Sequence, residues 1–296
     1  MINCSRFDIC CDDVVWYTFF GGDLMIQKLS QLPSPALAGV VREKTGRAAI
    51  ACIQNCFYAG ATMIDLHLSC LENSSLETLS SIVKSSRLPI LALNYNNAFD
   101  CSHAGYSEED RIESFLRAVE AGAAGIDMQG YTFHTPSKTD FCGEDKYSFT
   151  KGNPREIVTD ESIIAKQCQL IEKVHSMGAE VLLSCHPNVV MNCEQVVDLA
   201  LFLEKRNPDI IKIVTVAKNE DDLAEAIKTM SVLKKEVKTP ITYHANGNAG
   251  KASRIINPLL GGHIAFCVER YNEASTMEQL DLSTARSIVD NYNKLV

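Results

Sequence analysis

The segments Glu180-Val-Leu-Leu-Ser-Cys-His186 and Asp209-Ile-Ile-Lys-Ile-Val-Thr-Val216 decide how the chain is interpreted. Both have the apolar composition of buried parallel strands, yet the first ends in His186 and the second carries Lys212 in its middle. Apolar surroundings disfavour the charged form of a lysine, and a neutral amine is a nucleophile. A histidine on a neighbouring strand can transfer protons near neutral pH. The two segments therefore predict a catalytic pair within a parallel sheet.

Composition narrows the class of protein. The chain has 296 residues, 46% of them hydrophobic, which suits a large globular domain with a substantial core. Its net charge of -9 and the absence of a basic run argue against nucleic acid as a partner. No apolar run reaches the roughly 18 residues that a membrane span needs. We expect a cytoplasmic protein with a small-molecule partner and, because barrels often pair, a possible homodimer.

Apart from the adjacent pair Cys10 and Cys11, the twelve cysteines are spread along the chain, several of them singly in apolar stretches, as at Cys52, Cys168 and Cys267. That distribution predicts buried reduced thiols rather than a disulfide framework. Zinc-type CxxC spacing is also missing, so we do not expect a zinc site.

Apolar segments and helical patterns alternate in a regular way from Ala36 onward. Eight apolar segments carry the strand signal: 36–41, 63–68, 89–95, 125–129, 180–185, 209–216, 240–244 and 263–268. Eight strand–helix units predict a (β/α)8 TIM barrel. A doubly wound open sheet is the alternative, but it would more often show a glycine-rich turn after its first strand, which Val40–Gly46 is not.

Two segments fall outside this alternation. Residues 1–35 are expected to form an N-terminal extension, with a hairpin around Val14–Phe20 that covers one end of a barrel spanning 36–296. Residues 131–158 are a long polar insertion, which is typical of a functional lid or a surface loop.

Polar residues lie inside or just after the predicted strands. In a barrel these positions converge on one pocket at the carboxyl ends of the strands. They are Asp65, His67, Asn94, Tyr95, Asp127, Gln129, His186, Lys212, His244 and Asn246. An amine at this place can condense with a ketone to give a Schiff base, whose iminium acidifies the adjacent C–H bond.

Three motifs in the second half of the chain resemble the type I 3-dehydroquinate dehydratases. Ser184-Cys-His186 with Asp209-Ile-Ile-Lys212 resembles the family's His and Lys strands. Gly247-Asn-Ala-Gly-Lys-Ala-Ser-Arg254 is similar to its Gly-x-x-Gly-x-x-Ser-Arg motif, and Ala274-Ser-Thr-Met-Glu-Gln279 to its Ala-Ser-x-x-x-Gln loop.

The resemblance implies a cofactor-free lyase of the shikimate pathway that dehydrates a cyclic hydroxylated keto acid such as 3-dehydroquinate. It also implies that Lys212 forms the Schiff base and that His186 is the general acid–base. Arg254, Ser275 and Gln279 would hold the carboxylate and hydroxyl groups of the substrate.

The first half of the chain departs from the family pattern. Asp65-Leu-His67 stands where the family carries Glu-x-Arg, and Tyr95 stands about where it carries an Arg. We expect Asp65, His67 and Tyr95 to contact the substrate on this altered side. The family's glutamate that orients the catalytic histidine is also replaced, and Asp100, Asp127 or Glu269 could substitute for it. Gln129 takes the place of an acid on the fourth strand.

Two other functions fit the same residues. A class I aldolase-like lyase also needs only a buried lysine and a nearby base, and would act on another keto acid. A catalytically altered barrel could instead serve as a carboxylate-binding protein.

Overall fold

The computed structural model describes residues 27–95, 107–134, 157–187, 189–272, 275 and 278–295. Within them, strands and helices alternate along the chain as the sequence predicts. The strands are β1 (Ala36–Val41), β2 (Met63–His67), β3 (Ile90–Leu93), β4 (Gly125–Gln129), β5 (Glu180–Cys185), β6 (Ile210–Val216), β7 (Ile241–Asn246), β8 (Ile264–Val268) and β9 (Leu280–Asp281). The helices are α1 (Gly46–Tyr58), α2 (Leu76–Ser85), α3 (Glu108–Glu120), α4 (Glu161–Ser176), α5 (Cys193–Glu204), α6 (Glu220–Glu236), α7 (Ser253–Leu259) and α8 (Leu282–Asn293).

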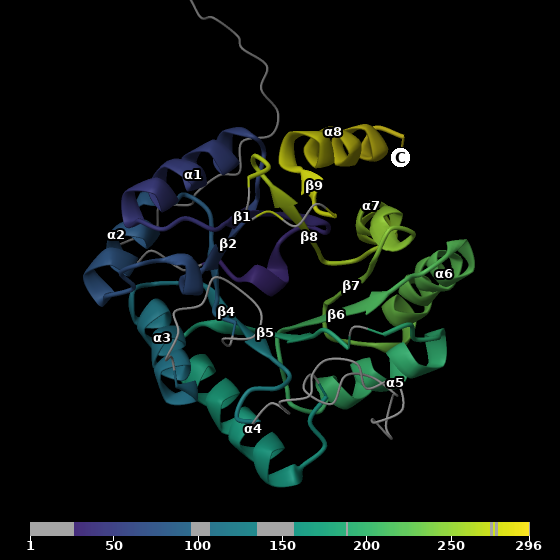
Figure 1. The fold of residues 1–296 in the computed structure, drawn as a ribbon, viewed down its shortest axis with the longest axis horizontal. Helices are drawn as coiled ribbons and strands as arrows, with labels where there is room; N and C mark the ends of the chain where they lie inside the picture. Colours follow the sequence, from purple (N-terminus) through teal and green to yellow (C-terminus); the bar gives the residue numbers. More distant parts are fainter. Residues whose placement is uncertain are drawn as a thin grey trace, which may run out of the picture.

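The strands form one curled parallel sheet in the order β7-β6-β5-β4-β3-β2-β1-β8-β9. Its two ends meet where His263 N donates to Ile241 O at 2.8 Å and Ile264 N donates to Thr242 Oγ1 at 2.9 Å. Figure 1 shows the strands arranged around a centre with the helices outside them. The predicted TIM-barrel-like fold is therefore confirmed.

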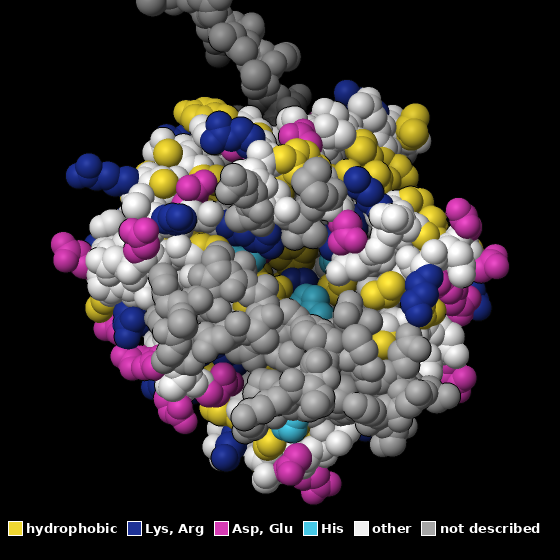
Figure 2. Space-filling view, in the orientation of Figure 1, with side chains coloured by type: hydrophobic (Ala, Val, Ile, Leu, Met, Phe, Trp, Pro, Cys, Tyr) yellow, Lys and Arg dark blue, Asp and Glu magenta, His cyan; other side chains and the backbone are white. Residues whose placement is uncertain are grey.

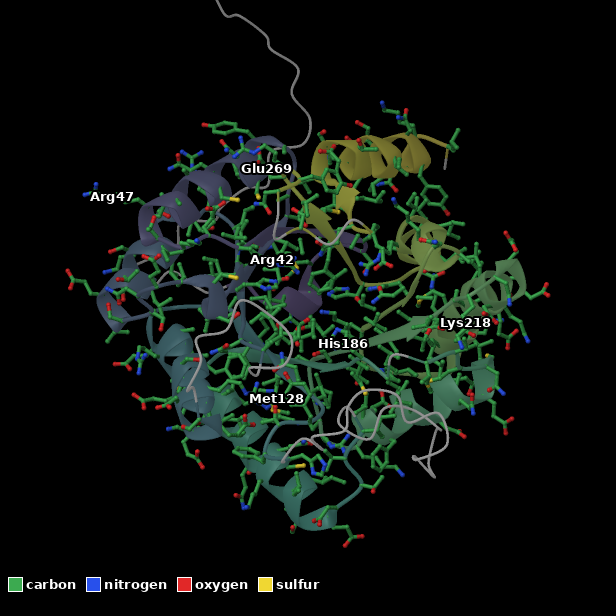
Figure 3. All side chains as sticks on the ribbon, viewed as in Figure 1. Arg42, Arg47, Met128, His186, Lys218 and Glu269 are labelled. Carbon is green, nitrogen blue, oxygen red and sulfur yellow. The ribbon has the colours of Figure 1, made fainter. Side chains whose placement is uncertain are left out.

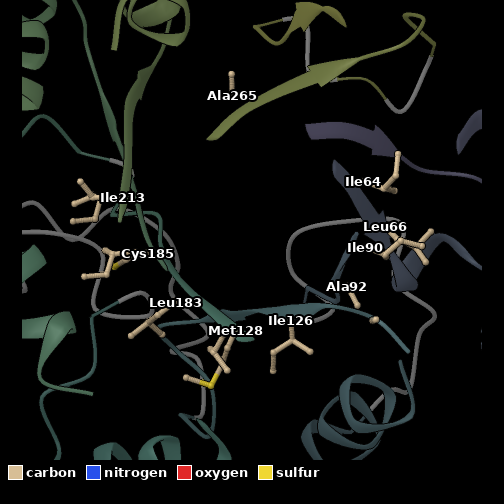
Figure 4. Packing of buried hydrophobic residues seen from close by; sticks show 14 of the residues in the cluster. Ile64, Leu66, Ile90, Ala92, Ile126, Met128, Leu183, Cys185, Ile213 and Ala265 are labelled. Atoms are coloured by element: carbon tan, nitrogen blue, oxygen red, sulfur yellow. The ribbon is translucent and has the colours of Figure 1, made fainter. Parts of the chain in front are cut away.

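Side-chain alternation along the strands creates two apolar layers. One set of strand residues packs outward against the helices, for example Ile64, Leu66, Ile126 and Leu183 (Figure 4). The other set fills the barrel interior toward the amino ends of the strands, together with Leu29 and Leu32 from the turn that precedes β1 and Ala124 just before β4. The residues of this inner cluster are Leu29, Leu32, Ala36, Ala38, Val40, Met63, Leu91, Ala124, Leu182, Ile210, Ile264 and Phe266. Apolar side chains thus fill the barrel interior at the amino ends of the strands, and a site can form at their carboxyl ends.

A short 3₁₀ turn, η1 (Leu29–Gln31), closes the amino end of the barrel. Ser30 donates through its backbone N and its Oγ to the Glu180 carboxylate, at 2.9 and 2.6 Å. The His263 ring bonds the Leu29 carbonyl oxygen through Nε2 and Ser34 Oγ through Nδ1, each at 2.9 Å. A cover at this end was expected from the N-terminal extension, but the predicted hairpin lies in residues 1–26, outside the described part.

Most of the predicted insertion, residues 135–156, also lies outside the described part. The cysteine prediction needs one correction. Cys52, Cys56, Cys168, Cys185, Cys193 and Cys267 are free thiols, but Cys70 is disulfide-bonded. Disulfides depend on proximity in space, which the spacing of cysteines along the sequence does not reveal. In the part of the chain that is described, no helix is long and apolar enough to cross a membrane.

Candidate active site

A cavity of about 130 Å³ lies at the carboxyl ends of the barrel strands. Figure 2 shows a central hollow in this face, with lysine or arginine and histidine side chains inside it. The cavity is lined by Arg42, Asp65, His67, Leu93, Tyr95, His186, Lys212, Val214, His244, Asn246, Arg254, Phe266 and Gln279. The structure thus brings together most of the predicted site residues. Four others do not line the cavity: Ser275 lines a neighbouring cavity, Asp127 pairs with Lys212, and Asn94 and Gln129 bond Ser114 and Arg111.

The alternation of β6 directs Lys212 into the barrel. Ile210 belongs to the interior layer, and Lys212 and Val214 line the cavity above it. Ile211 and Ile213 belong to the outer layer beneath the helices. The lysine is therefore flanked by isoleucines along the chain, yet its side chain lines the cavity.

Lys212 is 5% exposed, and its charge has a buried partner. Its Nζ lies 3.2 Å from Asp127 Oδ2 on β4 and 4.3 Å from the centroid of the Phe266 ring on β8. A carboxylate and an aromatic face both stabilise a cation at this position. An iminium formed on Nζ would carry the same positive charge, so these contacts suit a Schiff base as well as the free ammonium.

His186 follows β5 and lies within a row of aromatic rings. The Tyr95 ring contacts the His186 ring edge to face, with centroids 6.0 Å apart. On its other side Tyr95 contacts His67 at the same distance, and His67 Nε2 lies 3.4 Å from Asp65 Oδ2. The residues that depart from the family pattern therefore pack next to the predicted acid–base.

The three carboxylates considered as partners of His186 have different positions. Asp127 pairs with Lys212. Glu269 lines a neighbouring cavity of about 20 Å³ rather than the one that contains His186. Asp100 lies outside the described residues. The His186 ring contacts the ring of Tyr95.

The Gly247–Arg254 motif has a physical basis in the turn after β7. Gly247 has φ 88°, and a Cβ on Gly250 would lie 2.6 Å from Ala245 O, so the turn requires glycine at both positions. Ser253 Oγ accepts from Ala245 N at 2.9 Å and donates to Gly250 O at 2.6 Å. These contacts fix the start of α7 and thereby the place of Arg254.

Arg254 points into the cavity from α7. Its Nη2 donates to Asn246 Oδ1 at 2.5 Å and lies 3.9 Å from Glu278 Oε2. Burial lowers the pKa of Arg254, and Glu278 opposes that shift. Among the described residues, the buried cavity atoms without a hydrogen-bond partner include Arg254 Nε, Gln279 Oε1 and Asp65 Oδ1. They are placed to bind a polar ligand.

Ser275 is placed apart from this cavity. Its Oγ donates to Asn272 Oδ1 at 3.1 Å and accepts from Asn272 N at 2.9 Å. It lines the smaller neighbouring cavity, which shares Arg42 with the larger one.

His244 is a second buried imidazole in the cavity, 6% exposed. Burial lowers the pKa of His244 well below its ordinary value, and the positive charges of Arg254 and Lys212 act in the same direction. This ring is therefore neutral near pH 7 and can accept as well as donate a hydrogen bond.

Arg42 is a cavity residue that the sequence reasoning missed. It follows β1 and continues the alternate, inward-facing positions Ala36, Ala38 and Val40. This two-residue spacing is the signal that could have identified it. Figure 3 shows Arg42 and His186 near the centre of the barrel, whereas Arg47 lies at its periphery.

Arg111 supports the altered side of the site from behind. This 2% exposed guanidinium of α3 donates to Asn94 O, Gln129 Oε1 and Thr132 Oγ1 at 3.1, 2.6 and 2.9 Å. It also pairs with Glu108 at 2.7 Å. Gln129, which replaces an acid of the family, is thus a link between Arg111 and the end of β4.

The described residues contain no cluster of three or more His, Cys, Asp or Glu side chains that could hold a metal ion.

Comparisons with known proteins point to one family. The family model described as Type I 3-dehydroquinase matches residues 155–295. A 3-dehydroquinate dehydratase of Staphylococcus epidermidis is 26% identical over 131 residues, which are 44% of this chain and 54% of that protein. One of Desulfotalea psychrophila is 23% identical over 63% of this chain and 69% of its own length. The chain thus spans about half the length of the first of these curated relatives.

The similarity in fold covers more of the chain than the similarity in sequence. The crystal structure of 3-dehydroquinate dehydratase from Geobacillus kaustophilus superposes with a TM-score of 0.70, covering 90% of this chain and 96% of that one at 12% identity. The matched sequence region contains His186, Lys212, Arg254 and Gln279, while the altered residues Asp65, His67 and Tyr95 precede it. The chain resembles the type I 3-dehydroquinases in the sequence pattern of its second half and in its fold.

Proposed function

We propose that the protein is a Schiff-base-forming dehydratase that acts on 3-dehydroquinate or a closely related cyclic hydroxylated keto acid. The observation that carries this proposal is that Lys212, His186 and Arg254 line one cavity at the carboxyl ends of the barrel strands. A nucleophilic amine, an acid–base group and a carboxylate-binding fork are the groups that such a reaction needs.

Substrate binding uses the polar atoms that face the cavity. Arg254 receives the substrate carboxylate, for which a guanidinium fork is well suited. Gln279 contacts a hydroxyl group beside it. Asp65, His67 and Tyr95 contact the ring hydroxyls from β2 and the end of β3. The ring ketone then lies against Lys212 Nζ.

Covalent catalysis begins when the Lys212 ammonium gives a proton to the His186 imidazole and Nζ, now neutral, adds to the ketone carbon. The carbinolamine oxygen takes this proton from the imidazolium and leaves as water, and the product is an iminium bound to the enzyme. Asp127 at 3.2 Å and the Phe266 ring at 4.3 Å stabilise this cation. The iminium withdraws electrons from the adjacent carbon and makes its C–H bond acidic.

Elimination and release follow from the proton chemistry of His186. Its imidazole takes the proton from the acidified carbon, and the resulting enamine expels the β-hydroxyl group, which receives a proton from the imidazolium and leaves as water. Hydrolysis of the remaining iminium consumes one water and frees Lys212. The sum over all steps is the loss of one water molecule from the substrate.

The direct test follows the absorbance of the conjugated enone formed from 3-dehydroquinate. The wild-type protein should produce it, Lys212→Met should not, and His186→Asn should lower kcat by about 10²- to 10⁴-fold. Cleavage of the carbon skeleton by the wild-type protein would indicate an aldolase-type reaction instead. A folded protein that binds 3-dehydroquinate without turnover would indicate a carboxylate-binding barrel.

A further inference from the structure

The candidate active site contains two guanidinium groups that come from opposite ends of the barrel sequence. Arg254 reaches the cavity from α7, and Arg42 reaches it from the position after β1. Although the two residues are far apart in the sequence, they come near each other because β1 pairs with β8, in the register Ala36↔Ile264 to Val40↔Val268. Arg42 also lines the adjacent small cavity, so it lies at the boundary between the two.

The surroundings of Arg254 are incomplete without a ligand. Its Nε and Gln279 Oε1 are buried, and neither has a hydrogen-bond partner among the described residues. Its Nη2 is occupied by Asn246 Oδ1. Burial lowers the pKa of Arg254, Glu278 opposes the shift, and the charge of Arg42 adds to the lowering. An anion placed between the two guanidiniums would complete the hydrogen bonds and neutralise their repulsion.

We infer that Arg42 is a specificity-determining residue, which holds the substrate carboxylate together with Arg254. This inference rests on the proposed function, because it assigns one more contact to the same substrate. It goes beyond the sequence motifs, since Arg42 belongs to none of them. β1 lies beside β2, whose inward-facing residues Asp65 and His67 bring no guanidinium to this side. Arg42 is therefore the positive charge that this part of the cavity wall supplies.

Binding without chemistry tests the inference. Quinate has the ring carboxylate and hydroxyls but no ketone, and methyl quinate lacks the negative charge. Isothermal titration calorimetry should show that Arg42→Gln weakens quinate binding by about 10- to 100-fold and leaves methyl quinate binding nearly unchanged. Arg47→Gln is the matched control, because Arg47 is exposed on α1 and its loss changes the net charge by the same amount. It should bind quinate like the wild type.

A second variant covers the case in which Arg42→Gln does not fold. Arg42→Lys keeps the charge but loses the fork, and should weaken quinate binding by about 3- to 10-fold. Absence of quinate binding by the wild-type protein, or equal quinate affinity in the folded Arg42 variants, overturns the inference. Neither result touches the proposed function, which is decided separately by enone formation from 3-dehydroquinate.

Discussion

Lys212 and Asp127 form the buried charge pair at the floor of the candidate site. Their side chains are 7% and 0% exposed, and Nζ lies 3.2 Å from Oδ2. Removing one member of such a pair leaves an uncompensated buried charge, which costs more than the pair itself contributes. The lysine therefore has a structural role beside its proposed chemical one.

We expect Lys212→Met to lower the free energy of unfolding by about 3–5 kcal/mol, because the Asp127 carboxylate is left buried without its cation. Urea titration monitored by circular dichroism measures the loss. The double variant Lys212→Met with Asp127→Asn should regain a large part of it. A double variant as unstable as the single one would show that the cost does not come from the orphaned charge.

Tyr95 is expected to position His186 through its ring. Tyr95→Phe keeps the edge-to-face contact and should retain most of kcat, whereas Tyr95→Ala should lower kcat by about 10-fold or more. The pH dependence of kcat should also change in the alanine variant, since the environment of the His186 imidazole changes. Steady-state kinetics across pH gives both readouts, and a loss confined to KM would contradict a positioning role.

The sequence identified some of these residues and missed others for a physical reason. A lysine among isoleucines and a histidine at a strand end contrast with their apolar neighbours, so Lys212 and His186 stand out. Arg42 is followed by Glu43 and Lys44, in a segment where another charge is unremarkable. Its orientation toward the cavity depends on the alternation of β1, which is visible only once the strand is placed.

Helix α3 links the carboxyl ends of β3 and β4. Its N-terminus is capped by Ser107, whose Oγ accepts from Asp110 N at 3.0 Å. From its second turn, Arg111 bonds the ends of both strands at Asn94 and Gln129. The helix thereby supports the two strands that present Tyr95 and Asp127 to the cavity.

We expect Arg111→Met to destabilise the fold by about 3–5 kcal/mol, because it breaks a buried charge network. Arg117→Met on the same helix is the matched control. Arg117 pairs with Glu113, whose side chain is 68% exposed, so its removal should cost less than about 1 kcal/mol. Chemical denaturation compares the two, and equal losses would contradict the assignment of a supporting role to Arg111.

The sequence predicted where the strands and helices lie more accurately than it predicted the residues at which they begin and end. The strand β4 was predicted at its observed bounds, because an apolar run between turn residues has few alternatives. The turn after β7 continues as η3 (Gly250–Ala252) followed by α7, and the short β9 is not among the eight predicted strands. These features depend on contacts such as that of Ser253 with Ala245, which periodicity does not show.

The barrel as a whole buries histidines at both of its ends. His244 lies in the cavity at the carboxyl ends, and His263 lies beneath η1 at the amino ends. Burial lowers the pKa of His244 and of His263. The Leu29 carbonyl partly opposes the shift of His263 by accepting a hydrogen bond from its ring.

These shifts predict that acid destabilises the fold. Below the ordinary histidine pKa of about 6.5, the unfolded chain binds protons that the folded chain does not. The free energy of unfolding should therefore fall as the pH decreases, by at most about 1.4 kcal/mol per pH unit for each histidine. Urea titrations near pH 7 and near pH 5 measure the change.

Two variants test whether His244 causes this loss of stability in acid. His244→Asn should reduce the loss of stability on acidification, because one of the two imidazoles whose pKa is lowered by burial is gone. His134→Asn, which removes a half-buried histidine outside the cavity, should leave the loss nearly unchanged. Identical pH dependence in the wild type and His244→Asn would contradict the assignment to His244.

At the scale of the whole molecule, the sequence predicted the barrel because eight strand–helix units have few ways to close. It did not predict the disulfide at Cys70 or the separate position of Ser275, since both depend on how distant segments meet. The altered first half of the chain could be recognised but not interpreted from sequence. The ring contacts of His67, Tyr95 and His186 gave it a physical meaning.

Reductive trapping tests the proposed chemistry most directly. The protein is incubated with 3-dehydroquinate, reduced with sodium borohydride, and digested for peptide mass spectrometry. We predict a covalent adduct on the peptide that contains Lys212 in the wild-type protein and no adduct at that position in Lys212→Arg. An enzyme that turns over 3-dehydroquinate without an adduct on Lys212, or with an adduct on another lysine instead, would contradict the Schiff-base mechanism.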